Sequence, residues 1–508
     1  MRIHARPLSA AWFVLSLLLV SAASATAAEP KLPPLRPLPP AIASRLDTLT
    51  AAAAVYRGLS LEHQVTMGQV GPDDLRTRIT AIVDRELPDQ VLTPVDRLLT
   101  DFGLLPADYE LAEDYPELLT SQIAGFYDPI EKTLILTDRP GGILGPEVAK
   151  RFGPKAAARV EEMATVHELT HAIQDQHFPL LARLSSAREP LADSLTAATA
   201  LCEGDANLVM YSFLLGIAVE RLPMIGQMMA AAATGDPARR AEMLSPFPGV
   251  PGADQLTSTP AYLRETLVFP YLQGFVFALA VRQAGGQKLL DYAFAQDPPS
   301  SSEQLLHPEK WLGARDQPIL ISLQPAIEPL TAGDRAPFAG YRVTARGSHG
   351  ELGVNLWLTA RLGDQSWQTA QSAAAGWGGD AFLYLESDSG PGLVVWVCDW
   401  DTVADADEFE TAAGHTAAPA SESLWQIHRP SPTRVTLIRG TLKESARKDL
   451  ASALANAHAE KQPGPSIDLQ ALGIGPADLP RPPEQAELMQ LLNNPLLEGL
   501  MSGAPSGE

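Results

Sequence analysis

HELTHAIQDQHF, residues 167–178, is the stretch that determines the expected fold around it. Gly153-Pro154 precedes it and places a proline at the first turn of a helix, where its missing N–H would be unpaired anyway. Residues 155–176 then contain neither glycine nor proline, and Pro179 ends the segment. Alanine, glutamate, glutamine, leucine and methionine dominate it, and all are good helix formers. The sequence therefore predicts one uninterrupted helix over about residues 154–176.

Two histidines of this predicted helix, His167 and His171, are four residues apart and so share one face. Both imidazoles can bind the same metal ion, and Glu168 then lies beside that ion. This H-E-x-x-H pattern is typical of zinc sites in which the glutamate is the general base for a water molecule. We therefore expect one Zn²⁺ per chain. The alternative interpretation is an amphipathic helix with two half-exposed histidines.

A catalytic zinc site needs a third protein ligand and keeps its fourth position open. His177 has the spacing of the metzincin pattern, in which a third histidine follows six residues after the second. That pattern requires a sharp turn and a glycine where this chain has Gln174. If the helix continues instead, His177 lies about 240° around the axis from His171 and away from the metal.

Glu203 is the other candidate for the third ligand. It lies in Glu203-Gly-Asp-Ala, which interrupts an otherwise apolar helical stretch over about residues 191–222. Two acidic groups in such surroundings are costly unless they are paired or bind a metal. We favour Glu203 over His177, and we expect Asp205 to accept a hydrogen bond from the ring N–H of a ligand histidine.

The rest of the chain predicts an α+β protein. Residues 42–325 form a mainly helical domain with a β-hairpin over 123–137 and a buried helix over about 262–284, and residues 326–460 form a smaller α+β domain. In the smaller domain we expect four strands and two helices, at 341–345, 353–358, 381–386 and 393–397, and at 405–412 and 444–457. Residues 461–508 are rich in proline, glycine and serine and predict a largely disordered tail.

The N-terminus indicates export. Residues 1–28 combine Arg2 and Arg6, an apolar run and an Ala25-Thr-Ala cleavage site, as in a signal peptide, and 29–41 form a proline-rich linker. No later segment reaches the roughly 18 unbroken apolar residues of a membrane span. The formal net charge of −22 argues against nucleic acid as a partner. We expect a periplasmic or secreted protein without stable membrane insertion.

Several motifs together resemble a known type of enzyme. HELTHAIQDQHF followed by EGDA is similar to the gluzincin type of zinc metallopeptidase. AGFYDP at 124–129, EGDA at 203–206 and SSEQLLHPEKW at 301–311 resemble a group of poorly characterised exported bacterial proteins regarded as metallopeptidases. The resemblance covers roughly residues 120–312. It implies a zincin-like domain, His167, His171 and Glu203 as zinc ligands, Glu168 as base, and a peptide or protein substrate.

The resemblance alone does not define the mode of cleavage, so we take it from other features of the sequence. The chain lacks the Gly-x-Met-x-Asn segment of aminopeptidases, so we expect an endopeptidase. The 123–137 hairpin could offer an edge strand to an extended substrate. A rival hypothesis is a non-catalytic binding or assembly protein of the cell envelope with a structural or degenerate zinc site, although a structural site has no use for Glu168.

Other residues have two open interpretations each. Four side chains could stabilise an oxyanion or could be ordinary structural groups: Tyr127, Tyr211, Tyr271 and His307. Gly376-Trp-Gly-Gly-Asp could line a substrate surface or form a turn beside core tryptophans. Cys202 and Cys398 could pair or remain buried thiols. We expect His349 and His428 at ordinary exposed or strand positions.

Overall fold

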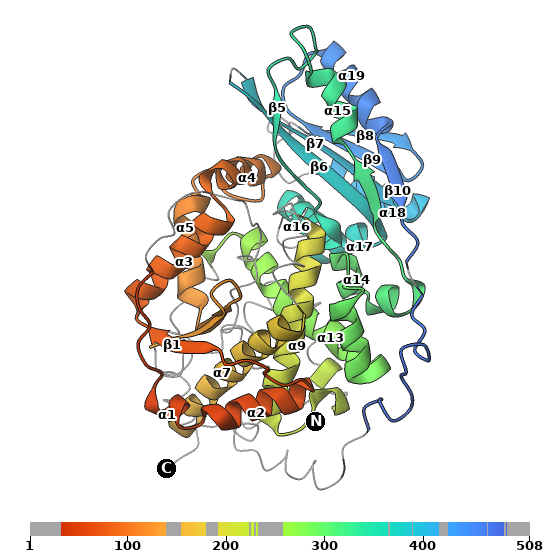
Figure 1. Ribbon diagram of the computed structural model, residues 1–508. Helices are drawn as coiled ribbons and strands as arrows, with labels where there is room; N and C mark the ends of the chain where they lie inside the picture. The colour runs from red at the N-terminus through yellow and green to blue at the C-terminus, as the bar shows by residue number, and fades with distance from the viewer. Residues whose placement is uncertain are drawn as a thin grey trace.

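The chain is an α+β protein, as predicted (Figure 1). A helical body carries a small three-stranded sheet, and a five-stranded antiparallel sheet lies at its upper end in the view of Figure 1. The structure is a computed structural model and describes the following residues: 32–138, 154–178, 192–222, 225–227, 230–231, 258–363, 366–388, 390–415, 425–464, 466–481 and 484. The predicted signal peptide lies outside these residues.

The first part of the body is helical, in keeping with the mainly helical domain predicted for residues 42–325. Its helices are α1 (Pro40–Ala43), α2 (Leu46–Arg57), α3 (Pro72–Glu86), α4 (Asp89–Phe102) and α5 (Leu111–Gln122). Strand β1 (Thr66–Val70) interrupts them and was not predicted. Its partner lies far along the chain, so no local pattern reveals the pairing. In the linker, Arg36 forms a β-bridge with Gln69 of β1.

The predicted hairpin is confirmed. Strands β2 (Gly125–Asp128) and β3 (Thr133–Thr137) pair antiparallel, and β1 pairs with β3 in parallel. The strand order is β1-β3-β2, so β2 is an edge strand of this sheet. Its free edge lies against helix α7 (Pro154–His177). The hairpin therefore lies directly beside the H-E-x-x-H segment.

Three long helices form the centre of the body: α7, α9 (Asp193–Leu215) and α13 (Ala261–Ala295), all near their predicted positions. Helices α9 and α13 pack closely because glycines face each other. A Cβ atom added at Gly204 would lie 2.0 Å from the backbone oxygen of Gly274. Among the described residues, α13 alone is long and apolar enough to cross a membrane, and 78% of its most apolar window is buried inside the protein. A buried core helix has this same composition.

The five-stranded sheet has the order β5-β6-β7-β9-β8, and all its neighbours are antiparallel. Its strands are β5 (Arg342–Gly347), β6 (Trp377–Ser387), β7 (Gly390–Trp400), β8 (Trp425–Ser431) and β9 (Arg434–Arg439). Alternate residues of β7 enter two different cores: Val395 and Val397 in one, Trp396 and Cys398 in the other.

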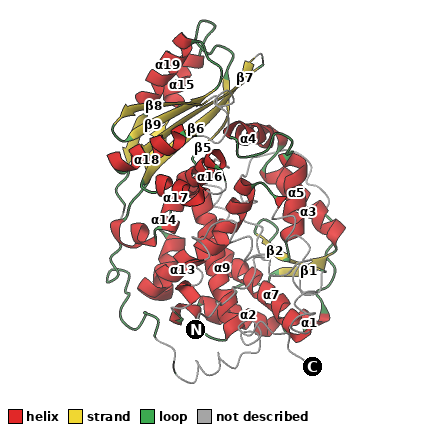
Figure 2. Ribbon diagram, turned by 180° about the vertical axis from the view of Figure 1, so that it is seen from behind, coloured by secondary structure: helices red, strands yellow, loops and turns green. Residues whose placement is uncertain are grey.

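Helices cover both faces of this sheet (Figure 2). One face packs against α15 (Gln324–Thr331) and α19 (Glu444–Ala455), and the other against α16 (Gly350–Leu362) and α18 (Val403–Gly414), with α17 (Trp367–Ala374) beside α16. The second face also packs against α4, where the Phe102 and Trp396 rings are 5.5 Å apart. One hydrophobic core therefore crosses the domain boundary expected near residue 325.

Residues 353–358 are helical and not a strand, so that prediction is wrong. Val354, Leu356 and Leu358 recur at every second position, as on the buried face of a strand, with polar Asn355 and Thr359 and apolar Trp357 at the other positions. In α16 all of these residues are buried, including the polar ones. The alternation is therefore not a two-faced pattern, because the helix lies between the sheet and the body.

The segment after residue 461 also differs from the expected disordered tail where the structure describes it. Strand β10 (His458–Lys461) pairs with β4 (Ile319–Ser322). Farther on, Ile474 is buried and Asp478 pairs with Lys288 of α13 at 3.0 Å. This part of the tail contacts the body, and most of residues 482–508 lie outside the described residues.

Candidate metal centre

Helix α7 carries the H-E-x-x-H residues without a break from Pro154 to His177. His167 and His171 project from one face, and their ring centroids are 4.7 Å apart. His167 and Glu168 are buried, and His171 is half-buried. The pentapeptide thus lies inside the protein, which argues against two solvated histidines on an outer face.

Glu203 of α9 meets these histidines. The Nε2 atoms of His167 and His171 are 3.1 Å apart, and Glu203 Oε2 lies 3.1 Å from the first and 3.4 Å from the second. Around a tetrahedral zinc with ligand distances of about 2.05 Å, ligand atoms are about 3.3–3.4 Å apart. The three atoms therefore form a triangle of the size that one face of such a site requires.

The charges in this triangle also fit a cation. Burial alone would raise the pKa of the Glu203 carboxyl, but the two histidines beside it hold that pKa well below its usual range. Burial likewise lowers the pKa of His171, and the adjacent Glu203 carboxylate more than offsets this and raises it to about 9. A buried carboxylate thus stabilises positive charge at this point, as it would stabilise a bound Zn²⁺.

Glu168 lies at the edge of strand β2. Its carboxylate accepts a hydrogen bond from the backbone N–H of Tyr127. A Cβ atom added at Gly125 would lie 3.7 Å from Glu168 Cγ, so the side chain runs along the strand edge. Burial raises the pKa of this carboxyl to about 8. The two glutamates near the histidines therefore differ: Glu203 is held as a carboxylate, and Glu168 binds a proton readily.

Gln174 orients His171. Its side-chain amide donates to the backbone oxygen of Cys202 at 3.0 Å and to Asp205 Oδ2 at 2.8 Å, which directs its carbonyl toward the histidine. Gln174 Oε1 lies 2.9 Å from His171 Nδ1 and can only accept, so Nδ1 carries the hydrogen. In the neutral ring the Nε2 lone pair then points toward Glu203 and His167, where a metal would need it.

The expected role of Asp205 is therefore corrected. Asp205 accepts its hydrogen bond from Gln174 and not from a histidine ring. It therefore supports His171 through Gln174, and not directly as predicted. It also pairs with the buried guanidinium of Arg57 at 2.5 Å, and Arg57 reaches Asp291 of α13 at 2.9 Å. Sequence reasoning missed Gln174 and Arg57. The three-residue spacing from His171 to Gln174 on one helix was a usable signal, but Arg57 gave none.

The other candidate residues for the site differ in their surroundings. His177 Nε2 lies 2.8 Å from the backbone oxygen of Ser60, so this residue turns away as a continuous helix requires. The Tyr127 hydroxyl donates to Asp175 at 2.8 Å. Tyr271 of α13 is the one of the four proposed oxyanion donors that stacks on His167, at 6.2 Å between ring centroids.

Two of the proposed donors lie in other surroundings. Tyr211 packs edge-on against Phe275, and His307 binds Glu351 at 3.0 Å. His349, expected at an exposed or strand position, is buried at the start of α16, whereas His428 lies in β8 as one alternative foresaw.

Asp380 of the Gly376-Trp-Gly-Gly-Asp motif has a structural role. Its carboxylate accepts hydrogen bonds from the indole N–H groups of Trp377 and Trp396, at 3.0 and 2.8 Å, and from two backbone N–H groups at the start of α16. The motif is thus part of the core. Cys202 and Cys398 are both buried and form no disulfide.

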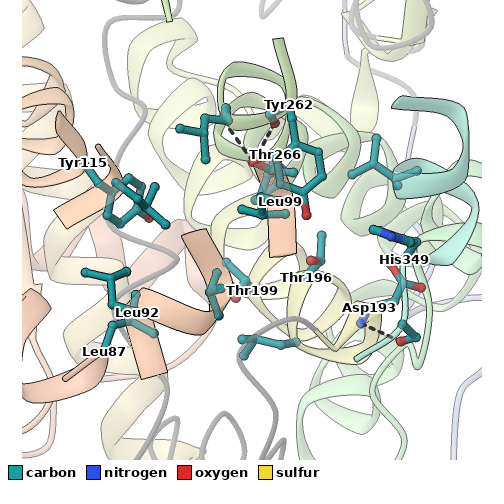
Figure 3. Close-up of a pocket in the computed structure, with 18 residues that line it drawn as sticks. Leu87, Leu92, Leu99, Tyr115, Asp193, Thr196, Thr199, Tyr262, Thr266 and His349 are labelled. Atoms are coloured by element: carbon teal, nitrogen blue, oxygen red, sulfur yellow. Dashed lines mark hydrogen bonds between the residues drawn. The ribbon is translucent and has the colours of Figure 1, made fainter. Parts of the chain in front are cut away.

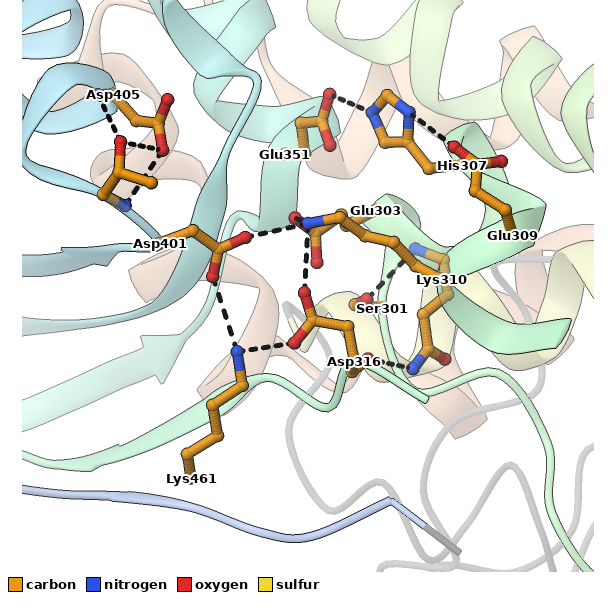
Figure 4. Close-up of polar contacts among 12 residues, drawn as sticks. Ser301, Glu303, His307, Glu309, Lys310, Asp316, Glu351, Asp401, Asp405 and Lys461 are labelled. Carbon is orange, nitrogen blue, oxygen red and sulfur yellow. Dashed lines mark hydrogen bonds and ion pairs between the residues drawn. The ribbon is translucent and has the colours of Figure 1, made fainter. Parts of the chain in front are cut away.

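A cluster of three acidic residues lies where the helical body meets the five-stranded sheet (Figure 4). Carboxylate oxygens of Glu303, Asp316 and Asp401 lie within 4.8 Å of one another. The Lys310 ammonium contacts all three, at 2.5, 3.1 and 2.9 Å, and Lys461 contacts Asp316 at 2.5 Å. Lysine ammonium groups therefore occupy the position that a metal ion would take.

Comparison with known proteins identifies a family for part of the sheet region only. A family described as a domain of unknown function (DUF8575) matches residues 340–443, which run from β5 to just before α19. No curated protein and no solved structure matches the chain significantly. The matched residues do not include α7 or α9, so the function of the candidate metal centre depends on its own geometry.

Proposed function

We propose that the chain is a zinc-dependent endopeptidase with a zincin-like catalytic domain of the gluzincin type. The observation that carries the proposal is the meeting of His167, His171 and Glu203, with Glu168 adjacent on the same helix. The three ligand atoms are of the types that bind zinc in catalytic sites, and their separations suit a tetrahedral arrangement. The signal-like N-terminus supports a periplasmic or secreted location.

In the proposed hydrolysis, each side chain of the site has its own role. Bound zinc supplies a Lewis acid and an acidified water molecule. Glu168 accepts a proton on its carboxylate from the attacking water and delivers it to the leaving amine. Gln174 keeps the hydrogen of His171 on Nδ1, so that Nε2 remains a ligand. A structural zinc site would need none of this arrangement around Glu168.

Strand β2 offers a means of binding the peptide backbone. Thr137 N–H donates to the Ala124 oxygen at 3.0 Å, so the peptide groups of Gly125 and Tyr127 point away from β3. That outer edge faces α7, and the Tyr127 N–H already donates to Glu168. An extended substrate that pairs with this edge would bring its backbone next to Glu168. Backbone pairing suits internal stretches of a protein, as an endopeptidase requires.

The decisive test replaces Glu168 with Gln and measures zinc content and proteolysis together. We expect about one zinc per chain in both proteins, and a fall in the cleavage rate of an unfolded protein by roughly 10²–10⁴-fold in Glu168→Gln. Glu161→Gln, on the same helix, is the matched control and should cleave at the wild-type rate. Equal rates in Glu168→Gln and wild type would disprove the proposal. A zinc-loaded wild type that cleaves nothing would favour the envelope binding protein.

A further inference from the structure

A cavity lies between the N-terminal helices and the first halves of α9 and α13 (Figure 3). Leu87, Leu92 and Tyr115 line one end, Thr196 and Thr199 of α9 line the middle, and His349 lies at the other end. Its volume is about 90 Å³. At roughly 10–15 Å³ for one water-sized group, this is room for roughly six to nine non-hydrogen atoms. That is the size of one large side chain and too small for a long acyl chain.

The cavity lies one helical turn along α9 from the candidate metal ligand Glu203. Thr199 precedes Glu203 by four residues, so both lie on the same face of α9, about 6 Å apart along the axis. On α13, Pro270 lines the cavity and the next residue, Tyr271, stacks on His167. A substrate residue beside the reacting bond is therefore within reach of the cavity.

The lining selects for apolar groups. Most of it consists of leucine, valine and proline side chains and the rings of Tyr115 and Tyr262. Two polar residues at the far end are already hydrogen-bonded: the Asp193 N–H donates to Ser348 Oγ at 3.1 Å, and the Asp193 carboxylate accepts from the Ser302 N–H at 2.7 Å. A charged side chain would lose its hydration here and find no opposite charge at the middle of the cavity.

Resting on the proposed function, we propose that this cavity is the specificity pocket of the endopeptidase. It receives one large apolar side chain of the substrate, such as leucine, methionine or phenylalanine, from a residue beside the scissile bond. Thr196 faces the middle of the cavity, and its replacement by a bulky residue would occupy the space that the substrate side chain needs.

The test measures binding without cleavage, in the zinc-loaded full chain carrying Glu168→Gln. Two capped alanine-based peptides are compared by calorimetry, one with a central phenylalanine and one with alanine throughout. We expect the phenylalanine peptide to bind about 10–100-fold tighter. Adding Thr196→Phe should reduce this preference to less than about threefold and leave the affinity for the alanine peptide unchanged.

Three further variants control the result. Thr196→Val keeps the volume and should keep the preference, as should Thr77→Phe on the exposed side of α3. Thr266→Phe fills the same cavity from α13 and serves if Thr196→Phe loses zinc or its cooperative melting. Equal affinity for the two peptides in the Glu168→Gln chain would overturn the proposal, whichever variants fold.

The two proposals fail in different ways. If the active chain cleaves unfolded protein but the two peptides bind equally, the pocket proposal is wrong and the endopeptidase stands. If the peptides bind with the expected preference but the wild type cleaves neither them nor unfolded protein, the pocket stands as a binding site and the hydrolysis is wrong.

Discussion

Two clusters in this protein each bring three possible metal ligands within 4.8 Å, and they differ in what compensates their charge. The cluster of His167, His171 and Glu203 consists of groups that all offer lone pairs to one point. The cluster of Glu303, Asp316 and Asp401 surrounds the ammonium group of Lys310. Proximity of ligand-type residues therefore does not identify a metal site. The two clusters differ because an ammonium group already lies among the carboxylates of the second.

The largest difference between the two clusters should appear in their effect on zinc affinity. We expect Glu203→Ala to weaken zinc binding by more than the roughly 100-fold that loss of an outer partner causes, because it removes a ligand itself. Competition with a chelator, followed by metal analysis, measures this. Asp401→Asn should keep its zinc, as should His177→Ala, whose ring binds Ser60. Loss of zinc in Asp401→Asn but not in Glu203→Ala would reverse the assignment of the two clusters.

The second cluster should instead affect folding stability. Lys310→Met leaves the Glu303 carboxylate, which is only 2% exposed, without its nearest cation. We expect the free energy of unfolding in urea to fall by about 3 kcal/mol, with zinc content unchanged. Lys448→Met is the control, because its pair with Glu444 is exposed, and the loss there should stay below about 1 kcal/mol. Equal losses in the two variants would contradict a stabilising role for Lys310.

A smaller effect on zinc affinity should distinguish the two glutamines of α7. Gln174→Ala removes the acceptor that holds the His171 hydrogen on Nδ1, so zinc affinity should fall by about 10–100-fold. Gln176→Ala is matched in chemistry and helix position, but its amide binds backbone groups of residues 62 and 63. Chelator competition should show no change for Gln176→Ala. An unchanged affinity in Gln174→Ala would mean that His171 needs no orienting partner.

Local patterns predicted much of the fold and part of the site. The spacing of His167 and His171 and the uninterrupted helix formers around them were sufficient for α7, and the costly acidic pair in an apolar run pointed to Glu203. The prediction of a strand at 353–358 was wrong. Burial on all sides of α16 removes the apolar–polar pattern by which the helical period of 3.6 residues is told from the strand period of two.

Contacts between distant segments were not predictable in this way. Strand β1 pairs with a strand more than sixty residues later, and Arg57 pairs with Asp205, which lies 148 residues later in the chain. The cluster around Lys310 joins three separate parts of the chain: residues 303–316, Asp401 and Lys461. A single sequence carries no signal for such contacts, because each depends on how the completed helices pack.

The contact between Gly204 and Gly274 has a consequence for the order of events during synthesis. Gly204, the neighbour of Glu203, contacts the backbone of a helix that the ribosome makes some seventy residues later. Before residue 274 has emerged, α9 can pack against α7 through Gln174, but the opposite side of α9 lacks its partner helix. The packing around the proposed zinc ligand Glu203 is therefore completed only late in folding.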